Sequence, residues 1–233
     1  MKIEVWSDYV CPFCYIGKRQ LEKAIQDSGY EDQIEVEYKS FELDPTTPTD
    51  TNELMYAVLE RKYSMSEAEV KKMTVSVAAR AAEVGLEYHF DNMLAANTNL
   101  AHRLAKLAKE EGKDSAYNER LMQAYFTENK AIGQPQVLKE IALELGLNME
   151  NVEQMMATNL YENQVEQDIY AAQQIGVRGV PFFVINNNYG ISGAQPQSLF
   201  EQTIEKAASE AGLTKSIKIV GNSGATCSDG QCN

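Results

Sequence analysis

Two cysteines near the start of the chain, Cys11 and Cys14, are separated by two residues. An apolar alternation over residues 3–6 predicts a β-strand before them, and the segment that follows Cys11 predicts a helix. At a helix start, unpaired N–H groups and the positive end of the helix dipole stabilise a thiolate. The spacing therefore indicates a reversible dithiol, in which an exposed Cys11 attacks a substrate disulfide and Cys14, beneath it, resolves the mixed disulfide.

The two residues between the cysteines offer few hydrogen-bond donors to a thiolate. Pro12 has no backbone N–H, and Phe13 has no side-chain donor. Donors to the thiolate stabilise the reduced dithiol and make the couple more oxidising. Their absence here indicates a less oxidising couple.

Local patterns predict the elements that position this dithiol. A helix over about residues 12–28 ends at Gly29, and a strict alternation over 33–39 predicts a second strand, so the chain begins with a strand, helix, strand crossover unit. Strand patterns return over 180–185 and 189–192, and three asparagines that tolerate positive φ join them. These two late strands are therefore expected to form a hairpin.

The middle of the chain has a helical pattern, from about residue 51 to Gly176, after two prolines interrupt the chain at 44–48. Capping residues and glycine stops predict several helices there. Their expected starts are Ser64 or Ser66, Asn97, Ser115, Pro135, Asn148 and Asn159.

The order of these elements predicts an α/β fold. A last helix that begins at Pro196 completes a thioredoxin-like core made of two separate parts, residues 1–48 and 177–213. Residues 49–176 are expected to form a large inserted all-helical domain. The remaining residues, 214–233, are small and polar around two further cysteines, and we expect a mobile tail.

Three segments resemble the DsbA family of thiol:disulfide oxidoreductases, and among its members the non-secreted, FrnE-like branch. They are residues 7–18 around the dithiol, 97–103, and 176–184 with its Gly-Val-Pro sequence. The resemblance covers the chain apart from the tail. It implies oxidoreductase or isomerase activity on protein or peptide thiols and disulfides. It also implies regeneration by a low-molecular-weight thiol or a reductase, and no organic cofactor.

The resemblance also implies roles at the site. It implies a cis peptide bond between Val180 and Pro181, opposite Cys11, where the Val180 backbone pairs with an extended substrate. Pro12 and Phe13 are expected to contact the same substrate. Strongly oxidising secreted members carry a histidine where this chain has Phe13, so we expect a reduction potential nearer about −270 mV than about −120 mV.

Cys227 and Cys232 form a second pair in the tail. Three interpretations are open: a redox pair that exchanges electrons with Cys11 and Cys14, a local disulfide without a catalytic role, or half of a zinc site that the first two cysteines complete. The dithiol chemistry itself requires no metal.

Charge and composition exclude several classes of partner. The net charge of −13 opposes binding to nucleic acid or anionic membranes, and no apolar run is long enough to span a bilayer. The N-terminal residues lack the apolar core of a signal peptide, so we expect a cytoplasmic protein, in which paired cysteines are more often catalytic than structural. The two histidines, His89 and His102, do not have a metal-ligand spacing; His102 and Arg103 either line the groove above the dithiol or make structural contacts.

Two alternatives remain open. Kappa-class glutathione transferases and 2-hydroxychromene-2-carboxylate isomerases resemble the chain in fold, but they typically have serine at the position of Cys11 and use no dithiol. The other alternative is a non-enzymatic zinc-binding or holdase protein, whose cysteines hold metal and whose insert binds exposed chains. Methionines of the insert either line such a groove or fill the core: Met55, Met65, Met73, Met93, Met122, Met155 and Met156.

Overall fold

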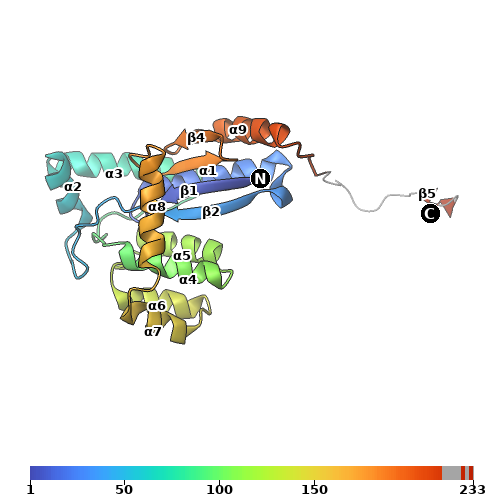
Figure 1. Ribbon diagram of the computed structural model, residues 1–233. Coiled ribbons are helices and arrows are strands. Elements are labelled where there is room, and N and C mark those ends of the chain that lie inside the picture. Colours follow the sequence, from blue (N-terminus) through green and yellow to red (C-terminus); the bar gives the residue numbers. More distant parts are fainter. Residues whose placement is uncertain (217–226, 229–230, 233) are drawn as a thin grey trace.

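A four-stranded mixed sheet lies at the centre of the computed structural model, which describes residues 1–216, 227–228 and 231–232 (Figure 1). The strands lie in the order β2, β1, β3, β4. β1 (Lys2–Ser7) pairs in parallel with β2 (Glu35–Ser40) and antiparallel with β3 (Phe182–Ile185), which forms a hairpin with β4 (Tyr189–Ser192). This topology confirms the predicted α/β, thioredoxin-like fold.

Helices cover both faces of the sheet (Figure 1). They are α1 (Pro12–Ser28) and α9 (Gln197–Glu210) on one face, and α8 (Glu162–Gln174) on the other. α1 and α9 pack against each other over an apolar core that includes Leu21 and Phe183. On the opposite face, Trp6 Nε1 donates a hydrogen bond to the carbonyl oxygen of Asp168 in α8, at 2.8 Å. Alternate residues of β1 therefore pack against the helices on opposite faces of the sheet.

The insertion between β2 and β3 is helical, as predicted. Before α8 it contains α2 (Met55–Tyr63), α3 (Glu67–Ala82), α4 (Asn99–Glu110), α5 (Asp114–Phe126), α6 (Pro135–Glu144) and α7 (Met149–Ala157). Two of the predicted caps are confirmed. Ser66 and Glu69 form a capping box at the start of α3, and the Asn148 side chain accepts hydrogen bonds from the first turn of α7.

Three predicted helix starts are wrong. Asn97 lies one residue before Thr98, the N-cap of α4. Ser115 lies inside the first turn of α5, whose N-cap is Lys113. Asn159 lies too early, because the N-cap of α8 is Tyr161, which has a φ of 69°. The Tyr161 hydroxyl donates to Glu110 of α4 at 2.5 Å, so a tertiary contact holds a conformation that is unfavourable for a bulky residue.

The division of the chain into core, insert and tail stays a prediction. α8, which lies in the predicted insert, contacts both α4 and β2. Most of the predicted tail lies outside the described residues; within it, β5 (Cys227–Ser228) pairs antiparallel with β6 (Gln231–Cys232). In the described part of the chain, every helix is too short or too polar to cross a membrane.

Candidate active site

Cys11 and Cys14 lie at the start of α1, as their spacing predicts. Cys11 is the N-cap residue and has an extended backbone. Pro12 occupies the first helical position, where a backbone N–H would have no acceptor within the helix. The Cys11 amide donates to the Asp8 carbonyl at 3.1 Å, and the Cys14 amide donates to the Cys11 carbonyl at 3.0 Å. This first turn holds both thiols at the positive end of the helix dipole.

The predicted exposure of Cys11 is wrong. Cys11 is 4% exposed and Cys14 is 2% exposed. The start of α1 is covered by the insert: α3 contacts α1, and the Tyr88 hydroxyl donates to the Pro12 carbonyl at 2.8 Å. Cys11 instead lines a cavity of about 340 Å³, which lies between the start of α1 and the helices α2 and α3.

The wall of this cavity is mostly apolar. Side chains from the insert and from α1 provide its surface, and they include Phe13, Met55, Val58, Met73, Val77 and Phe90. Charged residues on the wall are Asp8, Asp44 and Lys62. Of the methionines singled out by sequence, Met55, Met73 and Met93 line the cavity, whereas Met122 and Met155 are fully buried in the core. An apolar pocket therefore lies beside the dithiol.

The two sulfurs have different surroundings. Burial raises the pKa of the Cys14 thiol well above its ordinary value, and the neighbouring Cys11 raises it further. The Ser7 hydroxyl and the Asp8 backbone oppose this increase. The buried Ser7 hydroxyl has no hydrogen-bonding partner of good geometry among the described residues, so it remains available to the Cys14 sulfur. These surroundings favour a neutral thiol at Cys14 until it reacts.

The Val180–Pro181 peptide bond is cis, as the resemblance implies. The Cys11 thiol donates to the Val180 carbonyl at 3.4 Å, which places this loop directly opposite the first cysteine. Gly17 of α1 makes room for the loop. A Cβ atom at this position would lie 3.1 Å from Pro181 Cγ and 2.9 Å from Phe183 Cζ, so the close approach of α1 to the loop requires glycine.

Asp8 is a site residue that sequence reasoning did not single out. It is buried beside the dithiol, where its Oδ1 lies 3.3 Å from His102 Nε2 and its Oδ2 accepts a hydrogen bond from the Leu43 amide at 2.7 Å. The ring of Tyr9 lies 4.7 Å from the His102 ring. The Ser7-Asp8 dipeptide just before the dithiol was the available signal, but its partner His102 is 94 positions away.

His102 and Arg103 make structural contacts and do not line the cavity. The buried Arg103 guanidinium donates to the carbonyl oxygens of Met155 at 2.6 Å and Leu160 at 2.9 Å, and so joins α4 to α7 and to the segment that follows α7. No group of three or more potential metal ligands lies together within the part of the chain that the structure describes. The side chains of Cys227 and Cys232 lie outside that part, so the three interpretations of this pair stay predictions.

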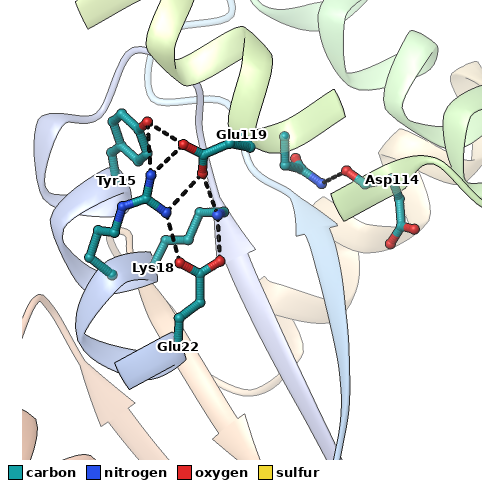
Figure 2. A network of polar contacts seen from close by, with 7 residues as sticks. Tyr15, Lys18, Glu22, Asp114 and Glu119 are labelled. Carbon is teal, nitrogen blue, oxygen red and sulfur yellow. Dashed lines mark hydrogen bonds and ion pairs between the residues drawn. The ribbon is translucent and has the colours of Figure 1, made fainter. Parts of the chain in front are cut away.

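A partly buried ionic cluster anchors α1 to the insert (Figure 2). Lys18 is 3% exposed, and its ammonium group donates to Glu22 and to Glu119 of α5, both at 2.5 Å. The Tyr15 hydroxyl donates to Glu119 at 2.6 Å, and Arg19 also binds this carboxylate. Burial raises the pKa of Glu119, but hydrogen bonds from Arg19, Lys18 and Tyr15 outweigh it and lower the pKa to about 2.

A mixed sheet, a Cys-X-X-Cys segment at the first helix start, an opposing cis-proline and a helical insertion define a thioredoxin-like protein with a DsbA-type architecture. The chain belongs to the DSBA-like thioredoxin domain family, whose model matches residues 2–205.

Individual relatives agree with this assignment. The chain is 34% identical to a probable DsbA oxidoreductase from Streptomyces coelicolor, with a TM-score of 0.86 over 100% of this chain and 98% of the other. It is 32% identical over 204 residues to the uncharacterized protein YwbO of Bacillus subtilis, over 87% of this chain and 94% of the relative. A 2-hydroxychromene-2-carboxylate isomerase shares the fold alone, at 17% identity and a TM-score of 0.68 over 92% of this chain and all of the other.

Proposed function

We propose that this protein is a thiol:disulfide oxidoreductase that exchanges disulfides with protein or peptide substrates through Cys11 and Cys14. The placement of Cys11 carries the proposal. Its thiol stands at a helix start, 3.4 Å from the Val180 carbonyl and on the wall of a cavity, while Cys14 is buried beneath it. Of the two sulfurs, only Cys11 lines a space that a substrate could enter.

The reaction has two exchange steps. The Cys11 thiolate attacks one sulfur of the substrate disulfide, forms a mixed disulfide and releases the other substrate sulfur as a thiolate, which takes a proton from water. Cys14 then loses its proton and attacks Cys11, which forms the Cys11–Cys14 disulfide and releases the second substrate thiol. Two electrons pass from the dithiol to the substrate, and both steps are reversible. A low-molecular-weight thiol or a reductase would restore the dithiol.

The loop opposite Cys11 supports a role in substrate binding. Val180 is half-buried beside the thiol, and the cis Pro181 has no N–H of its own. An extended substrate could therefore pair with the Val180 backbone as an added strand. Pro12 and Phe13 line the same cavity and would contact the residues that flank the substrate cysteine. We further place the protein in the FrnE-like, cytoplasmic branch of the family, on the three segments that resemble it.

The reduction potential is expected to lie nearer about −270 mV than about −120 mV. The Phe13 ring lies 4.9 Å from the Arg80 guanidinium and offers no donor to the thiolate, and Pro12 has no N–H. A reduced dithiol with few donors is a weak oxidant. Equilibration with glutathione redox buffers, followed by alkylation of free thiols, measures the value. A result close to the oxidising end of this range would contradict the expectation.

Reduction of insulin tests the proposed function directly. The reduced protein is expected to accelerate the reduction of insulin disulfides by dithiothreitol, because Cys11 can exchange with an accessible disulfide and dithiothreitol can restore the dithiol. Turbidity from the released chain reports the rate. A rate no higher than that of dithiothreitol alone would exclude an oxidoreductase that acts on this class of substrate.

A further inference from the structure

The cavity beside Cys11 differs in chemistry from a site for small anionic thiols. We propose that it binds a large apolar side chain next to the reacting cysteine of a peptide, and that the protein therefore discriminates against small anionic disulfides such as oxidised glutathione. This inference rests on the proposed function and names the substrate class of the same site.

The position of the cavity links it to the reacting sulfur. Cys11 and Val180 both lie on its wall, and Cys11 Sγ is 3.4 Å from the Val180 oxygen. A substrate that pairs with the Val180 backbone and is bonded to Cys11 through sulfur would therefore bring the side chains beside its cysteine to this space. The volume of about 340 Å³ is sufficient for a large side chain.

The wall of the cavity favours an apolar occupant. Met73 and Val77 of α3 and Val58 of α2 face the space from the insert, and Phe13 faces it from α1. At the rim, Leu43 and Tyr63 are exposed and extend the apolar surface outward. Burial of an apolar side chain here would remove it from water and place it against apolar surface.

The charged groups on the wall oppose an anionic occupant. Asp8 already accepts a hydrogen bond from the Leu43 amide, and Asp44 accepts two from Thr46, which lower the pKa of Asp44 and keep it negative. Lys62 is exposed, and it is the one basic residue among those that line the space. Each half of oxidised glutathione carries two carboxylates and one ammonium group, and this net negative charge would meet two acidic side chains and an apolar wall. An unpaired carboxylate in such surroundings is unfavourable.

Matched peptide disulfides test the inference. The disulfide dimers of Ac-Leu-Cys-Ala-NH2 and Ac-Glu-Cys-Ala-NH2 differ only in the residue before cysteine, and single-turnover oxidation of the reduced protein requires no regenerating partner. We expect the leucine dimer to react at least about tenfold faster than the glutamate dimer or oxidised glutathione, as the burial of one leucine side chain allows. Titration of the remaining protein thiols gives the rates.

A positive charge on the cavity wall should reverse the preference for the leucine dimer over the glutamate dimer. Val77→Lys is expected to slow the leucine dimer and to speed the glutamate dimer, because the new ammonium group can pair with the glutamate carboxylate. Val75→Lys is the matched control, since Val75 lies on the same helix, is 69% exposed and does not line the cavity; its preference should equal that of the wild type. Val58→Lys on α2 repeats the test from the other wall.

The outcomes separate the two proposals. Equal rates for the peptide dimers and oxidised glutathione, with insulin still reduced, would overturn the inference and leave the proposed function intact. A shift in preference with Val75→Lys as large as that with Val77→Lys would also overturn it. Failure to react with insulin and with every disulfide would instead contradict the proposed function. A reversed preference in Val77→Lys cannot come from unfolding, because the exposed thiols of an unfolded chain would react with both peptides alike.

Discussion

The Cys14→Ser variant is expected to accumulate a covalent mixed disulfide between Cys11 and its substrate. Cys14 is buried directly beneath Cys11 in the first turn of α1, so its removal leaves the attacking thiol in place and deletes the group that releases the substrate. Turnover with insulin should fall by on the order of 10³-fold or more, because a serine hydroxyl does not replace a thiolate in exchange. Non-reducing electrophoresis and intact mass would show the adduct.

The Cys11→Ser variant is the matched control for this experiment. It should lose turnover to a similar extent but form no adduct, because the remaining thiol does not line the cavity. Trapping that is equal in both variants would show that the assigned order of the two cysteines is wrong. Glutathione-dependent activity that survives at the wild-type rate in Cys14→Ser would favour a glutathione transferase or isomerase without a dithiol cycle.

The Glu119→Ala variant is expected to lose about 2–3 kcal/mol of unfolding free energy, because it leaves the buried Lys18 ammonium with a single partner. This range lies below the cost of about 3–5 kcal/mol for breaking a fully buried pair, since Glu119 is about a third exposed and Glu22 still binds Lys18. Urea denaturation monitored by circular dichroism measures the change. Glu22→Ala, which removes the more exposed partner, should cost less than about 1 kcal/mol.

The same cluster makes stability depend on acid pH. The pKa of Glu119 is lowered from its ordinary value of 4.5 to about 2 in the folded protein. Its contribution is therefore present above about pH 4.5 and is lost as the pH falls toward 2, because the unfolded chain takes up the proton first. The difference in stability between wild type and Glu119→Ala should shrink over this interval. A difference that stays constant down to pH 2 would show that the carboxylate charge does not stabilise the fold.

The elements around the dithiol could be predicted from sequence because their signals are local. Gly29 ends α1 in the left-handed conformation, with a φ of 79°, and Asn186 and Asn187 have the positive φ values that a tight hairpin requires. Ser66 and Asn148 cap their helices with neighbouring residues. Each of these features depends on a few consecutive residues, and each is confirmed.

The features that sequence reasoning missed depend on distant contacts. Cys11 is buried because Tyr88, which binds Pro12 across 76 positions, and the helices of the insert cover the start of α1. The Asp8–His102 contact joins residues 94 positions apart. The N-cap at Tyr161 similarly depends on Glu110 of another helix. Helix periodicity predicts that the insert packs somewhere, but it does not specify which surface of the core receives it.

Contacts of one residue, Asp168, show that the insert is an integral part of the fold. Asp168 of α8 accepts the Trp6 indole N–H of β1 through its carbonyl, and its carboxylate accepts the Ser40 amide of β2 at 2.9 Å and binds Lys106 of α4. Removal of the inserted segment would therefore expose the second face of the sheet. It would also leave the Trp6 indole N–H and the Ser40 amide without their hydrogen-bond acceptors. The sheet and the helical segment that follows β2 are therefore joined through Asp168, and α8 completes the second face of the sheet.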